Sequence, residues 1–231
     1  MAEFKKETHC SCCNLKLNIF RFLTDSELAQ INKNRFEVHF NKGETIFKQG
    51  GPFTHVACIT QGMAKVYLEG HKGKNVILKI LRPTELVGGP GFPVDYRHHF
   101  SVQAITEARA CFIDIHDFEE MMNTNRQFSM EFVRHLNKAT IHIYDKIQNL
   151  TQKQMHGRIA ETLLYLCNNV YKNGNFDTTL TRQDIADLSA MTKESAIRIL
   201  KEFKDDGIID YNSHTFNLLK PDQLEVISKT G

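Results

Sequence analysis

Residues 181–200 hold two short helical patterns only a few residues apart, and this spacing constrains the fold more than any other feature of the chain. The first pattern opens at Thr181, whose side chain stands at capping-box distance from Asp184. The second opens at Thr192, a residue type that accepts hydrogen bonds from first-turn N–H groups. A short turn about Ala190 separates them. Two helices joined in this way are typical of a helix-turn-helix motif.

The second helical pattern separates apolar from charged side chains. At about 100° per residue, one helix face collects the apolar positions and the opposite face collects the charged ones. The apolar positions are Ala196, Ile199, Leu200 and Phe203, and the charged positions are Glu194, Arg198 and Lys201. A polar helix face of this kind suits the major groove of DNA.

Glu194 and Arg198 are candidates for reading DNA bases. Arginine can donate two hydrogen bonds to guanine, and glutamate can accept one from cytosine. Lys193, Lys201 and Arg182 are better placed for contacts with phosphate groups. The alternative is that Glu194 and Arg198 form an ordinary i,i+4 ion pair on a solvent-exposed face. The surrounding helix-turn-helix pattern favours the base-reading interpretation.

A hairpin is predicted after the second helix. Gly207 is placed to end that helix, and two short runs of strand-forming residues follow at 208–211 and 215–219. The dipeptide Asn212-Ser213 supplies the turn between them. Such a hairpin forms the wing of a winged helix-turn-helix domain.

Residues 36–115 have the sequence pattern of a β domain. Short β-branched or aromatic runs occur at 36–40, 65–68, 76–80, 101–105 and 110–114, and nine glycines divide the segment. Many brief strands between turn residues favour an all-β sandwich or roll. Thr24 and Glu27 form a capping box that predicts a short helix just before this domain.

A heptad pattern follows the β segment, after a short helical stretch at 117–123. Its positions are Val133, Leu136, Thr140, Ile143, Ile147 and Leu150. This stripe either packs on the chain's own β domain or pairs with a second copy of the helix. We favour the dimer, because Phe128 and Phe132 offer a second apolar face for the β domain. A further helix is predicted over 154–171.

Length and composition exclude several classes of protein. The 231 residues suit one large domain or two modest ones, and they contain no nucleophile elbow, phosphate-binding glycine loop or HExxH motif, so we do not expect an enzyme. The chain has no run of 18 apolar residues and no apolar leader, so we expect a cytoplasmic protein with no membrane partner. The six cysteines are unevenly spaced, which fits a reducing compartment, and Cys58 and Cys167 are expected in the core.

The net charge by itself gives no argument for a nucleic-acid partner. The chain has 29 Lys+Arg against 27 Asp+Glu, and the residues from 151 onward carry ten basic and eleven acidic side chains. Within residues 192–204, however, four basic side chains accompany two acidic ones. The placement of charge, rather than its sum, therefore supports the prediction of DNA binding.

The order of these elements resembles the Crp–Fnr transcription regulators. The resemblance rests on residues 181–209, Gly157-Arg158-Ile159-Ala160, the run 40–47 (Phe-Asn-Lys-Gly-Glu-Thr-Ile-Phe) and Ile59-Thr60-Gln61-Gly62. It implies an α+β fold with an N-terminal cyclic-nucleotide-binding-like β-roll (a jelly roll) at 1–124. A dimerisation helix and hinge at 125–151 and a C-terminal winged helix-turn-helix at 152–231 would follow. It also implies a bacterial homodimer on palindromic double-stranded DNA, with RNA polymerase as a partner and an allosteric effector sensed by the β-roll.

The residue pattern and the resemblance together give seven candidate DNA-binding residues. They are Arg182, Thr192, Lys193, Glu194, Ile197, Arg198 and Lys201. By resemblance, Ile197 stands at a base-proximal position that is small or polar in the best-known members, and its side chain suits a thymine methyl group. The alternative function is a small-molecule or redox-sensing module whose winged helix contacts protein rather than DNA.

The resemblance places an effector pocket in the β-roll. Its candidate residues are Gly88, Gly89, Arg97, His98, His99, Ile143 and Tyr144. Cyclic-AMP-binding members hold the phosphate with a Gly-Glu pair and an Arg-Ser pair, where this chain has Gly88-Gly89 and His98-His99, so we do not expect cyclic AMP. Arg97 is available for a different anion. The alternative, which we favour for His98 and His99, is that they are ordinary loop or strand residues; the small-molecule effector stays unidentified.

Three cysteines near the start of the chain suggest a second kind of signal. Cys10 and Cys13 form a C-x2-C pair, and by resemblance Cys111 stands where oxygen-sensing members have an internal cluster ligand. That pattern requires one more cysteine, at a position that is Asn18 here. We favour no metal, with Cys111 as a buried core residue, and leave an iron–sulfur cluster or haem open as the alternative cofactor.

Overall fold

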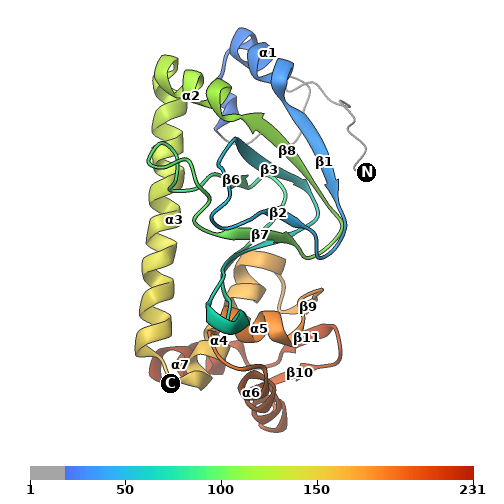
Figure 1. Cartoon of the computed structure of the whole chain (residues 1–231). Coiled ribbons are helices and arrows are strands. Elements are labelled where there is room, and N and C mark those ends of the chain that lie inside the picture. The colour runs from blue at the N-terminus through green and yellow to red at the C-terminus, as the bar shows by residue number, and fades with distance from the viewer. Residues whose placement is uncertain (1–18) are drawn as a thin grey trace. The chain divides into compact units, whose positions relative to one another are not determined.

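Two four-stranded sheets form the β-roll that the sequence predicts between residues 36 and 115 (Figure 1). The computed structural model describes residues 19–231. One sheet has the strand order β1-β8-β3-β6 and the other β2-β7-β4-β5. The strands are β1 (Phe36–Phe40), β2 (Thr45–Phe47), β3 (His55–Gln61), β4 (Ala64–Leu68), β5 (Val76–Leu81), β6 (Leu86–Val87), β7 (Ser101–Ala104) and β8 (Ala108–Asp114). Every predicted β run therefore coincides with a strand, except that the run 101–105 extends one residue beyond β7.

The described chain divides into two compact units. The first contains residues 19–68 and 80–141, and the second contains residues 69–79 and 142–231. The division falls within the long helix α3 (Arg126–Gln152), so this helix contributes residues to both units. Within residues 19–231, no helix is both long enough and apolar enough to cross a lipid bilayer.

The core of the first unit lies between its helices and the sheet that contains β3 and β8. The helical elements are η2 (Phe20–Phe22), α1 (Asp25–Asn34), α2 (Ile115–Thr124) and the first half of α3. Phe118 packs edge-on against Phe128 and Phe132, with ring centroids 5.1 and 4.9 Å apart. Phe128 and Phe132 are fully buried, so the second apolar face of the long helix packs into this core, as predicted.

The capping box at the start of α1 is also as predicted. The backbone N–H of Glu27 donates to Oγ1 of Thr24 over 3.3 Å, and the N–H of Thr24 donates to Oε2 of Glu27 over 2.7 Å. These two bonds satisfy donors that the first turn of a helix otherwise leaves open.

Helices and a three-stranded sheet of order β10-β11-β9 form most of the second unit. Its elements are η3 (His71–Gly73), α4 (Met155–Tyr165), the π-helix η4 (Leu166–Tyr171), β9 (Asn175–Asp177), α5 (Arg182–Leu188), α6 (Lys193–Asp205), β10 (Ile209–Tyr211), β11 (Thr215–Leu218) and α7 (Pro221–Thr230). The predicted wing hairpin is confirmed as β10–β11, and Gly207 ends the helix before it with a φ of +63°.

The sequence prediction differs from the second unit at three points. The helix predicted over 154–171 changes from α to π winding at Leu166. Strand β9, which adds to the wing sheet, and helix α7 were not predicted. Gly157 lets α7 approach α4 closely, because a Cβ at that position would lie 2.5 Å from the carbonyl oxygen of Gly231.

Candidate nucleic-acid interface

Side-chain caps fix the starts of both helices of the helix-turn-helix motif. The N–H of Asp184 donates to Oγ1 of Thr181 over 3.1 Å, and the N–H of Thr181 donates back to Oδ2 of Asp184 over 2.8 Å. At α6, the N–H of Ser195 donates to Oγ1 of Thr192 over 3.2 Å. Both predicted caps are present, and they set where each helix begins.

Helix α6 presents one buried and one exposed face, as the periodicity predicts. Ala196, Ile199, Leu200 and Phe203 form the buried face. The exposed side chains include Thr192, Lys193, Glu194, Ile197, Arg198 and Lys201. The structure therefore places six of the seven candidate DNA-binding residues together, at the start and on the solvent face of one helix.

The ion pair between Glu194 and Arg198, which was the alternative to base reading, is not present. Arg198 instead donates from Nη1 to Oε1 of Glu202 over 2.8 Å, one turn further along the helix. The other carboxylate oxygen of Glu202 lies 2.7 Å from Nε2 of His156 on α4. The hydrogen bond with His156 and the charge of Arg198 hold the pKa of Glu202 below its usual value. Within residues 19–231, no hydrogen bond or ion pair engages the side chain of Glu194.

Arg182 joins the start of α5 to the wing. Its guanidinium group donates from Nη2 to the carbonyl oxygen of Asn212 over 2.8 Å. The group also lies over the rings of Tyr211 and Phe216, 4.9 and 4.8 Å from their centroids. These contacts give Arg182 a positioning role at the wing, and its contact with a DNA phosphate stays a prediction.

Arg158 and Thr162 on α4 hold the turn between α5 and α6. Arg158 donates from Nη1 to the carbonyl oxygens of Ala190 and Ser189, over 3.1 and 3.4 Å. The hydroxyl groups of Thr162 and Ser189 lie 2.8 Å apart. Ala190 has a φ of +47°, a left-handed conformation that side chains rarely adopt, so these bonds stabilise a strained turn.

Lys146, near the end of α3, makes a further contact with this turn. Its ammonium group donates to the carbonyl oxygen of Leu188, the last residue of α5, where the helix dipole favours a positive charge. Burial lowers the pKa of Lys146 to about 8, although the nearby carboxylate of Glu161 opposes this shift. Neither Lys146 nor Thr162 was among the predicted functional residues.

Replacing Arg158 with alanine is expected to loosen the helix-turn-helix turn. The variant loses charge-assisted hydrogen bonds worth about 1.5–3 kcal/mol, so amide exchange in α5 and the start of α6 should accelerate by about 10- to 100-fold. Hydrogen–deuterium exchange with mass spectrometry measures this effect. Lys229→Ala, on the exposed surface of α7, is the control. Unchanged exchange in Arg158→Ala would show that the turn is stable without this contact.

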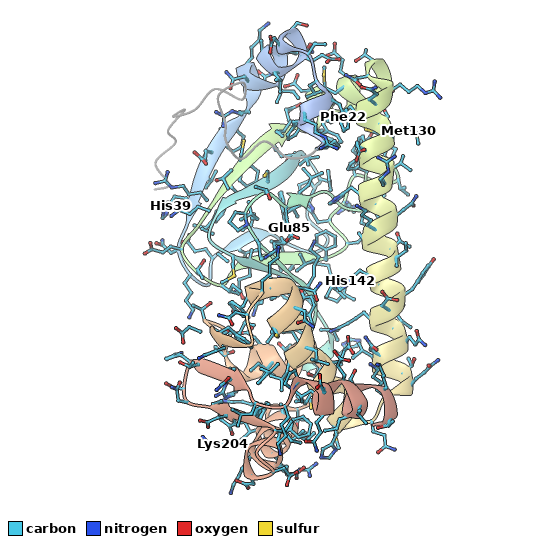
Figure 2. The ribbon with its side chains drawn as sticks, turned by 180° about the vertical axis from the view of Figure 1, so that it is seen from behind. Phe22, His39, Glu85, Met130, His142 and Lys204 are labelled. Atoms are coloured by element: carbon cyan, nitrogen blue, oxygen red, sulfur yellow. The ribbon has the colours of Figure 1, made fainter. Side chains whose placement is uncertain are left out.

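The exposed face of α3 differs in part from the predicted seam. Val133, Thr140 and Ile147 of that seam are exposed, whereas Leu136, Ile143 and Leu150 are half-buried. Leu136 packs against the core of the first unit. Three further large side chains are exposed on the helix, namely Met130, Ile141 and Tyr144, the last to 66%. Met130 and Phe22, both labelled in Figure 2, line one surface pocket.

The β-roll candidates for the effector pocket have different surroundings. His98 is buried between the rings of Phe47 and Phe53, whose centroids lie 4.1 and 4.7 Å from its own. Neither ring nitrogen of His98 has a hydrogen-bond partner within the described chain. His99 is exposed and lies 3.0 Å from the carboxylate of Asp95. Arg97 is also exposed and donates to the carbonyl oxygen of Gly50 over 2.9 Å.

The remaining pocket candidates lie in two different parts of the chain. A Cβ at Gly88 would lie 3.3 Å from the ring of Phe132, and one at Gly89 would lie 3.4 Å from the ring of Phe100. Aromatic rings thus crowd both glycines. Ile143 and Tyr144 belong to the part of α3 in the second unit. The seven predicted residues are therefore not assembled within one unit.

His98 makes stability depend on pH. Burial lowers the pKa of His98 to about 4, whereas an exposed histidine has a pKa near 6.5. The unfolded chain therefore binds more protons between these two values, so stability is complete above about pH 6.5 and falls as the pH drops towards 4. His98→Phe keeps an aromatic ring at this position but cannot take up a proton. Between pH 6.5 and pH 4 we therefore expect the free energy of unfolding to fall less in this variant than in the wild type, by up to about 3 kcal/mol.

Urea denaturation at several pH values tests this expectation. His99→Gln is the matched control, because His99 is exposed and its replacement should leave the pH dependence of the wild type. Identical pH profiles for His98→Phe and the wild type would contradict the neutral, buried state of His98.

The candidate metal ligands are only partly covered by the structure. Cys10 and Cys13, like Asn18, lie outside the described residues. Cys58 is buried as predicted, whereas Cys111 on β8 and Cys167, both expected to be buried, are half-buried. Within residues 19–231, no three His, Cys, Asp or Glu side chains are grouped so that they could hold a metal ion.

A β-roll sensory domain followed by a winged helix-turn-helix defines a class of signal-responsive DNA-binding protein. Residues 37–125 match the family model of the cyclic nucleotide-binding domain, and residues 157–227 match that of the Crp-like helix-turn-helix domain. Electron transport regulator A of Shewanella oneidensis is 25% identical over 225 residues, covering 91% of this chain and 90% of its own. Transcriptional activator protein anr of Pseudomonas aeruginosa is 23% identical over 231 residues, covering 97% and 93%.

Solved structures share the fold. FixK2 from Bradyrhizobium japonicum superposes with a TM-score of 0.77 at 19% identity, covering 84% of this chain and 98% of its own. A transcriptional regulator of the Crp/Fnr family from Eubacterium rectale gives 0.78 at 16% identity, covering 94% and 100%. The chain belongs to the Crp–Fnr family of transcription regulators, a family of regulators rather than enzymes.

Proposed function

We propose that this chain acts as a homodimer that recognises a palindromic DNA site with the α6 helix of each copy. The observation that carries this proposal is the mixed-charge, solvent-exposed face of α6 opposite a fully buried apolar face. Lys193, Ile197 and Lys201 flank the base-reading candidates Glu194 and Arg198 on that face. Glutamate and arginine at this spacing suit a G·C-containing step in the major groove.

The exposed apolar side chains of α3 support the dimer. Val133, Thr140 and Ile147 follow heptad steps, and the exposed Met130 and Tyr144 lie three residues before Val133 and Ile147. Exposed apolar side chains that recur along one helix face are typical of an interface, and a coiled-coil seam is the interface that heptad spacing provides. Two-fold symmetry would then place the two α6 helices on half-sites about one helical turn apart.

The regulatory partners follow from the family. Regulators of this class bind DNA, typically as dimers, and contact RNA polymerase, so we assign this chain the same partners in the cytoplasm. A small molecule other than cyclic AMP is the proposed effector, because aromatic rings crowd Gly88, Gly89 and His98. The domain boundaries proposed for this function are 1–124, 125–151 and 152–231.

Selection from random double-stranded DNA tests the proposed function. We expect the full-length protein to enrich a palindrome, and its affinity for that site to fall with salt. If Arg182, Lys193 and Lys201 of both copies each neutralise one phosphate, the logarithm of the binding constant should fall with a slope of about −5 against the logarithm of salt concentration. Absence of any enriched sequence, together with binding to a protein partner, would favour the alternative module that contacts protein.

A further inference from the structure

Cys58 and Cys111 stand opposite each other on neighbouring strands of the β-roll. The antiparallel register of β3 and β8 pairs Cys58 with Cys111, two residues from the pair Val56 and Ile113. Directly paired residues project from the same face of an antiparallel sheet, with Cβ atoms about 4.5–5.5 Å apart. Neither cysteine is in a disulfide.

This spacing is close to that of a disulfide bond. A disulfide requires Cα atoms about 4.4–6.8 Å apart and Cβ atoms about 3.5–4.5 Å apart. Paired antiparallel residues have Cα atoms about 4.5–5.5 Å apart, so the Cα spacing already fits. The Cβ atoms need to approach by about 1 Å, a movement that side-chain rotation and a small local strand shift can supply.

The two thiols have different surroundings. Cys58 is buried in the apolar cluster of the first unit, and its thiol donates to the carbonyl oxygen of Ile59 over 3.5 Å. Cys111 is half-buried, and its Sγ accepts from Nη1 of the buried Arg35 over 3.4 Å.

The acidic residue that pairs with Cys111 on the neighbouring strand β1 already has a hydrogen-bond partner. Glu37 on β1 pairs with Cys111 from the other side, and its carboxylate accepts from the hydroxyl group of Thr60 over 2.8 Å. Cys111 is the more accessible of the two thiols, which identifies it as the attacking thiol, and burial identifies Cys58 as the resolving thiol.

We propose that Cys58 and Cys111 form a reversible disulfide when the protein meets a peroxide. The Cys111 thiolate attacks hydrogen peroxide, an S–O bond forms as the O–O bond breaks, and the departing hydroxide takes a proton and leaves as water. The Cys58 thiol then attacks the sulfenic sulfur of Cys111, and the S–O bond breaks. The released hydroxide and the Cys58 proton leave as a second water. Two thiols lose two electrons, and one peroxide becomes two waters.

Peptide mapping of the oxidised full-length protein tests this proposal. Trypsin places Cys58 on peptide 49–65, Cys111 on 110–126, Cys167 on 159–172 and the three N-terminal cysteines on 7–16. After hydrogen peroxide treatment and alkylation of the remaining thiols, we expect 49–65 joined to 110–126, lighter than their sum by two hydrogen atoms. Treatment with dithiothreitol should separate them. Alkylated thiols on both peptides, or 110–126 joined to 7–16 instead, would overturn the proposal.

Two variants separate the roles of the thiols. Cys167→Ser should leave the cross-link unchanged. Cys58→Ser should abolish the cross-link and leave a sulfenic acid on 110–126, which dimedone labels. The opposite variant, Cys111→Ser, tests which thiol attacks. If dimedone labels its peptide 49–65 as fast as it labels peptide 110–126 of Cys58→Ser, the assignment of Cys111 as the attacking thiol is wrong.

Discussion

Arg198→Ala is expected to lower the affinity of the protein for its palindromic DNA site by about 30-fold or more. Each bidentate contact between arginine and guanine is worth about 1–3 kcal/mol, and a dimer makes the contact twice. The total of at least about 2 kcal/mol corresponds to this factor. Fluorescence anisotropy with labelled site DNA, at one fixed salt concentration, measures the loss.

The pair between Arg198 and Glu202 must break before Arg198 can contact a base, but its cost is small. The side chains of Arg198 and Glu202 are 54% and 40% exposed, and exposed ion pairs are worth about 0.2–1 kcal/mol. The expected gain from the base contact exceeds this cost. Glu202→Gln should therefore keep full affinity or increase it slightly, which makes it the matched control for Arg198→Ala.

Comparing the loss of affinity for the selected palindrome with the loss for unrelated DNA shows whether Arg198 contacts a base or a phosphate. If Arg198 reads a base, Arg198→Ala weakens binding to the selected palindrome more than binding to unrelated DNA. Glu194→Ala should likewise relax the sequence preference more than it weakens non-specific binding. An equal loss on both kinds of DNA would show that Arg198 contacts only phosphate.

The face of α6 could be predicted from the sequence, whereas the partner of Arg198 could not. The 3.6-residue period alone determines which side chains of a helix are buried, and Ile199 and Phe203 follow it. For Arg198, however, Glu194 and Glu202 both lie four residues away, so helix spacing does not choose between them. In the structure Arg198 pairs with Glu202, which is also contacted from α4 by His156, a residue distant in sequence.

The surroundings of His98 in the β-roll likewise could not be predicted from the sequence. The sequence identifies a histidine beside a basic residue, which is compatible with an anion site or with a buried ring. Its burial depends on Phe47 and Phe53, which lie about 50 residues earlier in the chain, and on the sheet that brings them together. In contrast, the missed helix α7 had a local signal, because Pro221 at its start and Asp222 in its first turn favour a helix N-terminus.

Heptad spacing alone does not determine which residues of α3 lie in the dimer seam, but the burial of side chains reduces the alternatives. Steps of three and four residues admit both Leu136 and Asn137, and both Ile143 and Tyr144, as neighbours of Thr140. In the structure, the half-buried Leu136 packs against the core of the first unit, whereas Asn137 and Tyr144 are exposed. A second copy of the helix would therefore meet Tyr144 and Ile147 directly.

Replacing both Tyr144 and Ile147 with glutamate is expected to convert the dimer to monomers. Each copy would bring two carboxylates into an apolar seam, where like charges would face their symmetry mates and lose solvation. Because a monomer contacts only one half-site, DNA affinity should fall by at least about 100-fold, more than for any single base-contacting residue. Sedimentation velocity measures the association state, and anisotropy measures the DNA affinity.

Three further variants determine which seam the dimer uses. Lys138→Glu places a carboxylate on an exposed position about 120° around the helix from Tyr144 and about 180° from Ile147, so it should remain dimeric. Ile143→Glu alters the half-buried position of the seam predicted from sequence. If Ile143→Glu forms monomers while Tyr144→Glu alone stays dimeric, the interface follows the predicted seam, which shares Ile147 with the exposed stripe. If all of these variants stay dimeric, α3 is not the dimer helix, because no intermolecular coiled coil on this helix tolerates charge at each of these positions.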